Sequence, residues 1–101
     1  MGDESVTMND LRLLREMYAD LDGEHYGLYL ARAAGLGTAA LYNSLARLER
    51  KGWVVSRWED VDPSQVGRPA RKYFRLTQKG IESYRTTLQA ITPPALLGGL
   101  A

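Results

Sequence analysis

Residues 33–41, AAGLGTAAL, join two amphipathic segments, and the turn that they encode decides the fold. Gly35 supplies a stop signal for the first segment, because glycine readily adopts the left-handed backbone that ends a helix. The second segment runs from about Thr38 to Arg50 and carries apolar residues at helical spacing, namely Leu41, Leu45 and Leu48. Two helices joined by so short a glycine-containing turn are typical of a helix-turn-helix.

Helices are also expected on both sides of this unit. Thr7 is a suitable cap for a helix that runs through Asp20, and Asp22-Gly23 would break it. A second helix is expected from Glu24 to Ala34. A fourth helix is expected from Thr77, with a stop at Pro93-Pro94.

Between the third and fourth helices the pattern changes from helix to strand. Residues 53–58 and 71–76 are rich in strand-forming residues, and the polar segment 59–70 joins them as a loop. The order helix, helix, helix, hairpin, helix predicts a mainly α-helical α+β fold with a small antiparallel β-hairpin, a winged helix-turn-helix. The expected divisions are a disordered N-terminus (1–6), the winged helix-turn-helix (7–76), a C-terminal dimerisation helix (77–92) and a flexible tail (93–101).

Composition narrows the class of protein. A chain of 101 residues without an internal repeat is expected to form one domain with a modest core. It has no cysteine, which fits a reducing cytoplasm. No segment is apolar enough for a signal peptide or a membrane span, so we expect a cytoplasmic protein without a membrane partner.

The net charge of +1 conceals an uneven distribution. Residues 1–31 hold two Lys/Arg against seven Asp/Glu, whereas residues 32–101 hold eleven against five. Such a basic region is expected of a site for a polyanion, although a solvated surface of ion pairs would produce the same count.

The third helix offers the residue types that read DNA. Its leucines mark the core face, so the other faces are free to meet the major groove. Asn43 can pair with adenine, Arg47 can reach guanine or a phosphate, and the hydroxyls of Thr38 and Tyr42 suit phosphate. A solvated surface without a partner remains the alternative. The recognition-helix candidates are Thr38, Ala39, Tyr42, Asn43, Arg47 and Arg50.

The hairpin loop and its second strand form the expected wing. Gly67 and Pro69 would shape a tip that holds Arg68 away from the sheet, where it can enter a minor groove or contact phosphate. Alternate strand residues point to opposite faces, so not all basic residues here can contact one duplex. The wing candidates are Arg68, Arg71, Lys72 and Arg75.

Two further sets of residues are candidates for contacts with a second copy or a ligand. Trp53 and Trp58 are interpreted either as packing residues or as the lining of an effector pocket. His25 has no companion ligands for a metal site, and no cofactor or catalytic group is expected. A seam between two chains is expected from the first and last helices, at Leu11, Leu14, Tyr18, Ile81, Tyr84 and Leu88.

Several short motifs together resemble the PadR-type transcriptional regulators. They span about residues 10–90 and are Tyr26-Gly27, Leu41-Tyr42, Arg47-Leu48-Glu49, Gly52, Gly67-Arg68-Pro69 and Tyr73-Phe74-Arg75-Leu76-Thr77. The family usually begins its third helix with a Pro-Gly-Thr type sequence, where this chain has Thr38-Ala39-Ala40, which leaves base preference open. The resemblance implies a homodimeric repressor of double-stranded DNA, often responsive to a small-molecule effector, with the C-terminal helix in dimerisation.

Two functions therefore remain open from the sequence. One is a dimeric repressor that binds a pseudo-palindromic operator, with the third helix in the major groove and the wing on the minor groove or backbone. The other is a winged-helix module for protein contacts or ligand sensing without strong sequence-specific DNA binding. The basic wing favours the first function, and the acidic loop residues Glu59, Asp60 and Asp62 with the two alanines of the third helix favour the second. The alternative interpretation of these acidic residues is that they only tether the wing.

Overall fold

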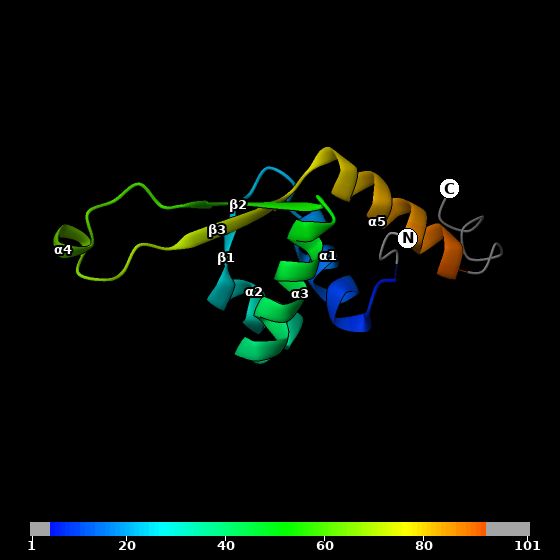
Figure 1. Cartoon of the computed structure of the whole chain (residues 1–101), viewed down its shortest axis with the longest axis horizontal. Coiled ribbons are helices and arrows are strands. Elements are labelled where there is room, and N and C mark those ends of the chain that lie inside the picture. Colours follow the sequence, from blue (N-terminus) through cyan, green and yellow to red (C-terminus); the bar gives the residue numbers. More distant parts are fainter. Residues whose placement is uncertain (1–4, 93–101) are drawn as a thin grey trace.

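Helices and a small sheet alternate along the chain in this computed structural model, which describes residues 5–92 (Figure 1). The helices are α1 (Met8–Tyr18), α2 (Gly27–Ala34), α3 (Thr38–Arg50), α4 (Pro63–Val66) and α5 (Gln78–Ile91). The strands are β1 (His25–Tyr26), β2 (Val54–Trp58) and β3 (Lys72–Leu76). All strand pairs are antiparallel, and the order in the sheet is β1-β3-β2. The predicted winged helix-turn-helix is confirmed.

Local signals in the sequence set the ends of the helices. Thr7 caps α1 in a capping box, in which its hydroxyl accepts from the Asp10 backbone and the Asp10 carboxylate accepts from the Thr7 backbone. Thr77 caps α5 by accepting from the backbone of Gly80. Gly35 ends α2 with a φ of 70°, the left-handed conformation that glycine tolerates.

The core forms where α1, α2 and α3 pack beneath the sheet. Each helix contributes one apolar face, because residues three and four apart lie on the same side of a helix. The stripe Leu41, Leu45 and Leu48 of α3 is buried, as the sequence predicts. The remaining buried apolar side chains are Leu13, Leu14, Met17, Leu30, Ala34, Trp53, Val54, Phe74, Leu76 and Tyr84.

The structure corrects the expected start of the second helix. Residues 25 and 26 form strand β1 instead of the first turn of a helix, with His25 opposite Phe74 and Tyr26 opposite Tyr73. The imidazole of His25 is buried, lies 3.3 Å from the carbonyl of Asp20 and stacks on Tyr29. Pairing with a strand some 50 residues away is a tertiary effect, which local helical spacing does not reveal.

Two other expectations about loops are also corrected. The segment 59–70 contains the single-turn helix α4, which Asp62 caps and Gly67 ends at a φ of 73°. Residues 5 and 6, expected within a disordered N-terminus, make contacts with the folded chain: Val6 packs against the core, and Lys51 donates a hydrogen bond to the carbonyl of Ser5. The expectations for residues 1–4 and 93–101 lie outside the described residues.

The wing and α5 leave the helical core on opposite sides (Figure 1). Strands β2 and β3 continue outward as two arms, and α4 lies at their far end. In Figure 1, α2 and α3 lie below the strands from which these arms extend.

A close backbone contact holds the start of α5 to the sheet. A Cβ on Gly80 would lie 2.1 Å from the carbonyl oxygen of Trp53, a backbone atom that cannot easily move away. We expect Gly80→Ala to lower the free energy of unfolding by about 3 kcal/mol, because overpacking forces the backbone to shift. Urea denaturation measures this, with Gln89→Ala on the exposed side of α5 as the control. A Gly80→Ala protein as stable as the control would contradict the close contact.

Candidate nucleic-acid interface

The outer face of α3 presents a polar surface that no other described element covers. Thr38, Ala39, Tyr42, Asn43 and Arg50 are all exposed, on the side opposite the leucine stripe. Gly37 is the N-cap and provides no side-chain hydrogen bond, so no side chain caps the first turn of α3. Such a helix start can approach an anion closely, because its backbone N–H groups point outward.

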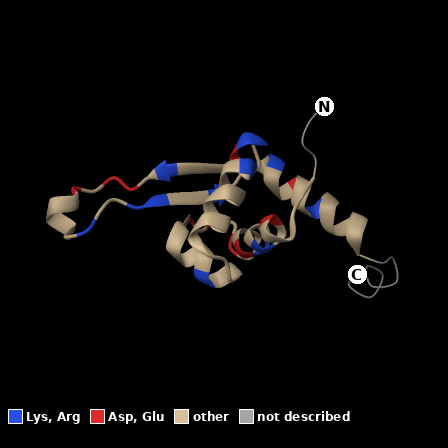
Figure 2. Cartoon of the chain, turned by 60° about the horizontal axis from the view of Figure 1, so that its bottom comes forward, with Lys and Arg blue, Asp and Glu red and all other residues tan. Residues whose placement is uncertain are grey.

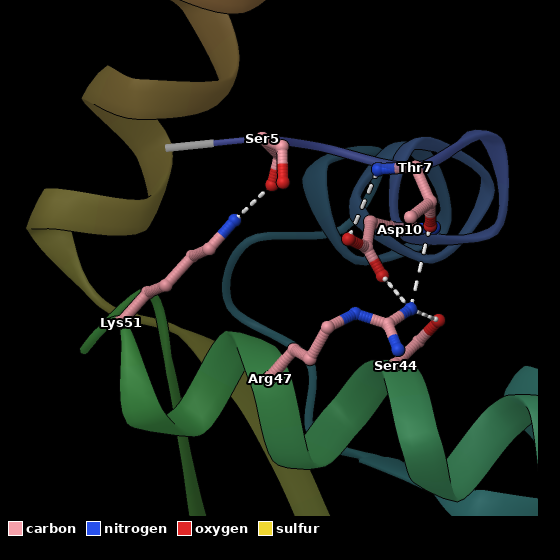
Figure 3. Close-up of polar contacts among 6 residues, drawn as sticks. All are labelled: Ser5, Thr7, Asp10, Ser44, Arg47 and Lys51. Carbon is pink, nitrogen blue, oxygen red and sulfur yellow. Dashed lines mark hydrogen bonds and ion pairs between the residues drawn. The ribbon is translucent and has the colours of Figure 1, made fainter. Parts of the chain in front are cut away.

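Arg47 lies differently from its predicted position on this outer face. Its guanidinium turns toward α1 and forms an ion pair of 2.8 Å with the Asp10 carboxylate (Figure 3). The same nitrogen donates to the hydroxyl of Ser44 at 2.9 Å and lies 3.4 Å from that of Thr7. The expectation that Arg47 reaches a base or phosphate is therefore corrected: the side chain holds α3 to α1.

Asp10 is fully buried, and its ionisation depends on this network. Burial raises the pKa of Asp10, but hydrogen bonds from Arg47, from the Thr7 backbone and from Ser44 outweigh burial and lower the pKa below its ordinary value. The carboxylate therefore remains charged at neutral pH. The Nε of Arg47 is buried without a hydrogen-bond partner among the described residues, which shows that the network is not fully satisfied.

A carboxylate also organises the wing. Glu59, which follows β2, accepts two hydrogen bonds from the guanidinium of Arg68, at 2.7 and 3.0 Å. It also accepts from the backbone N–H of Arg71 and from the hydroxyl of Tyr73. These donors, Arg68 first, lower the pKa of Glu59 to about 2 from its ordinary value of 4.5. The two arms of the wing are therefore joined across their base by one ionised side chain.

This contact corrects the expected position of Arg68. The sequence predicts that Arg68 is held away from the sheet, whereas the structure folds it back onto Glu59, with 34% of its side chain exposed. Its charge is largely compensated, since the pair is bidentate. The far end of the wing is instead formed by α4, which carries no basic residue.

The other predicted wing residues lie on two faces of β3. Arg75 is exposed on the face opposite the buried Phe74 and Leu76, whereas Lys72 lies on the same face as they do. The guanidinium of Arg71 lies 4.3 Å from the centre of the Tyr26 ring. Figure 2 shows basic segments on both arms of the wing and acidic segments in the loop between β2 and α4.

Between the helices and the wing lies a hollow of about 350 Å³, which we call the wing cleft. Tyr42 of α3 reaches its helical side, where a Cβ on Gly27 would lie 2.6 Å from the Tyr42 hydroxyl. The glycine therefore gives this tyrosine its room at the start of α2. The full lining is Tyr26, Gly27, Leu28 and Tyr42 from the helical side and Trp58, Ala70, Arg71 and Lys72 from the wing.

The two tryptophans do not share a pocket. Trp58 is 64% exposed and lines the wing cleft, whereas Trp53 is buried in the core and borders a separate hollow against α5. Within one protomer, the two tryptophans therefore line separate hollows, and an effector pocket at a dimer interface stays a prediction. Trp53 takes the packing role that was the alternative.

The predicted seam between chains divides into two groups. Leu14 and Tyr84 are buried inside the protomer, where Tyr84 packs against Tyr18 at 5.0 Å between ring centres. Burial raises the pKa of the Tyr84 hydroxyl. Leu11, Tyr18, Ile81 and Leu88 are only partly buried, and Met8 and Ile91 are largely exposed. The exposed apolar surface of α1 and α5 therefore lacks Leu14 and Tyr84 and includes Met8 and Ile91, which were not among the predicted residues.

The role of Asp10 was not predicted from the sequence. The Thr-x-x-Asp spacing from Thr7 to Asp10 could have indicated a capping box. Nothing in the sequence indicates that Arg47, 37 positions later, completes the same network. Glu59 takes the tethering role expected of the acidic loop residues, but the sequence does not indicate its partners, because they become neighbours only when the hairpin closes.

Among residues 5–92, no three His, Asp or Glu side chains are grouped so that they could hold a metal ion. No helix in that range is long and apolar enough to cross a membrane.

Comparison with solved structures gives the fold a wider context. A MepR mutant from a multidrug-resistant S. aureus clinical isolate matches with a TM-score of 0.73 and 21% identity, over 93% of this chain and 63% of MepR. An S. aureus MepR–DNA complex matches with a TM-score of 0.69 and 22% identity, over 85% and 64% of the two chains. NadR in complex with 4-hydroxyphenylacetate matches with a TM-score of 0.67 and 25% identity, over 82% and 53%.

These likenesses show that the winged-helix fold of this chain is also the fold of MepR and NadR. The chain spans less than two thirds of the length of each of these three structures. Comparison with curated protein sequences gave no match. The model of the transcriptional regulator PadR-like family matches residues 22–86, and the chain belongs to this family. The resemblance inferred from the short motifs is thereby confirmed.

The ion pair between α1 and α3 leads to a prediction about stability. Asp10→Asn leaves the Arg47 charge partly buried without its partner, so we expect the free energy of unfolding to fall by about 3 kcal/mol. Glu16→Gln, in an exposed pair with Arg15, is the control and is expected to lose less than about 1 kcal/mol.

The same variant has a defined pH dependence. Because folding lowers the pKa of Asp10, its ionised form stabilises the protein fully above the unfolded value of about 3.9 and loses this effect as pH falls through the folded pKa. The stability difference between wild type and Asp10→Asn should therefore narrow in acid, as measured by urea denaturation over a pH series. A constant difference would argue that Asp10 acts only through packing.

Proposed function

We propose that this protein is a DNA-binding transcriptional regulator that represses by binding an operator as a homodimer. In this proposal α3 lies in the major groove, and the wing lies on the neighbouring minor groove or backbone. The observation that carries it is the exposed polar face of α3, beside a wing with basic residues on both arms. Membership of the PadR-like family and the likeness to a structure solved with DNA support it. A protein that acts in this way works in the cytoplasm.

Within this surface, roles are assigned by residue chemistry. Asn43 is exposed and suits a bidentate contact with adenine, whereas Thr38, Tyr42 and Arg50 suit phosphate. Arg71, Lys72 and Arg75 make no ion pair among the described residues, so they remain able to meet the backbone. Arg47 and Arg68 are omitted from the direct contacts, because each is held by an internal carboxylate.

The test combines selection of a binding site with quantitative titration. Random duplexes are first selected on the purified full chain, and the selected site is then titrated by fluorescence anisotropy at several salt concentrations. We expect tighter binding to the selected site than to random DNA, with affinity falling as salt rises because phosphate contacts release counterions. Equal affinity for all duplexes would contradict the proposal and favour a module for protein contacts or ligand sensing.

A prediction about base readout follows from the position of Asn43. Asn43→Ala is expected to relax preference at one base pair of the half-site by about 1–3 kcal/mol, since a bidentate amide contact is lost. Titration against single-base variants of the selected site measures this, with Gln89→Ala on α5 as the control. An equal loss on every sequence would show that Asn43 contacts only the backbone.

The homodimer is proposed to form through α1 and α5. A shallow hollow of about 150 Å³ lies between these helices, lined by Met8, Leu11, Arg12, Arg15, Tyr84 and Leu88. Met8 is 64% exposed and Ile91 is 60% exposed, so both helices of the proposed interface offer apolar side chains to a partner.

Ile91→Glu is expected to weaken dimerisation at least about tenfold without unfolding the protomer, because the side chain is exposed. Sedimentation equilibrium measures the dimer constant, and circular dichroism checks the fold. Val55→Glu, which changes an exposed apolar residue on the outer face of the sheet, is the control. If Ile91→Glu leaves the dissociation constant of the dimer unchanged, the end of α5 lies outside the interface.

A further inference from the structure

The wing cleft has a composition that the general role of the wing does not explain. Three large apolar or aromatic side chains are exposed at it, with Trp58 64%, Leu28 55% and Tyr42 50% accessible. Exposed apolar side chains gathered at one hollow usually mark a contact surface.

Two cationic groups lie against aromatic rings of the same lining. The ammonium of Lys72 lies 5.7 Å from the centre of the Trp58 ring, and the guanidinium of Arg71 lies against Tyr26. Among the described residues neither cation forms an ion pair. Glu59, whose carboxylate accepts from the Arg71 backbone, already forms its ion pair with Arg68. The cleft therefore offers apolar surface and uncompensated positive charge together.

The position of the cleft identifies the partner. In B-form DNA, the major groove and the adjacent minor groove are separated by one sugar–phosphate strand. If α3 occupies the first groove and the wing the second, this strand must pass through the space between them. Of the cleft's lining, Tyr42 belongs to α3, and Trp58 and Lys72 belong to the arms of the wing.

We propose that the wing cleft holds one sugar–phosphate strand of the duplex, with Trp58 against a deoxyribose and Lys72 and Arg71 at the flanking phosphates. The inference rests on the proposed DNA-binding function and specifies a site within it. A sugar–phosphate strand carries apolar sugar faces beside anionic phosphates, which suits a lining in which aromatic and cationic side chains lie side by side. Because this strand looks alike in every sequence, the contact fixes the position of the duplex and does not read bases.

The two tryptophans provide a direct optical test. In Trp53→Phe the only remaining tryptophan is the exposed Trp58, and in Trp58→Phe it is the buried Trp53. Each full-length protein is titrated with the selected duplex, and quenching of its emission by acrylamide is measured with and without DNA. We expect DNA to shield Trp58 from acrylamide, with saturation at the dissociation constant found by anisotropy, and to leave Trp53 unchanged.

Substitutions provide a second readout. Trp58→Ala is expected to weaken binding about tenfold and equally on all sequences, as the loss of an aromatic stacking partner does. Lys72→Gln should reduce the slope of log affinity against log salt by about 1, because one phosphate contact is lost. Lys79→Gln, an exposed lysine on α5 outside the cleft, is the matched control and should leave the slope unchanged.

The outcomes separate this inference from the function on which it rests. If wild type binds a selected site but Trp58 stays accessible and Trp58→Ala binds normally, the cleft assignment is overturned and the proposed function stands. If wild type shows no preference for any duplex, both are overturned. Shielding of Trp58 that depends on protein concentration without DNA would place a second copy of the chain in the cleft and also overturn the inference.

Discussion

The ion pair between Asp10 and Arg47 determines how the exposed face of α3 is presented. The carboxylate lies in the first turn of α1 and has no exposed surface, and the guanidinium comes from the third turn of α3. A buried carboxylate without a partner is costly, so the orientation of α3 that supplies Arg47 is favoured over others. Asp10 also lies near the N-terminus of α1, where the helix dipole further stabilises its negative charge. One polar contact thus sets the angle at which Thr38, Tyr42 and Asn43 face outward.

A second carboxylate plays the equivalent part in the wing. Glu59 gathers donors from Arg68, Arg71 and Tyr73, so both arms of the hairpin are fixed where they leave the core. In both places an arginine that the sequence assigned to DNA is used for internal structure. The net charge of a segment therefore overstates what it can offer to a polyanion, because compensated arginines contribute little to phosphate affinity.

Most of the fold follows from local signals, and much of the site does not. Caps, glycine stops and apolar spacing located α1, α3 and α5 to within about two residues, because these signals act over one or two turns. Strand β1 could not be predicted in this way, because His25 and Tyr26 become a strand only by pairing with Phe74 and Tyr73. The direction of Arg47 and Arg68 likewise depends on partners brought close by folding, and spacing along one helix cannot show it.

The wing cleft carries more uncompensated positive charge than the tip of the wing, so it is the better candidate for contact with DNA. Helix α4, at the far end of the wing, has no basic residue, and Arg68 beside it is compensated by Glu59. Uncompensated charge is instead found at the base of the wing, where Arg71 and Lys72 face the start of α2 and Tyr42. A duplex that follows this charge is drawn toward the angle between helix and wing. There, the rigid contacts of Asp10 with Arg47 and of Glu59 with Arg68 hold both walls in place, so less conformational freedom has to be lost on binding.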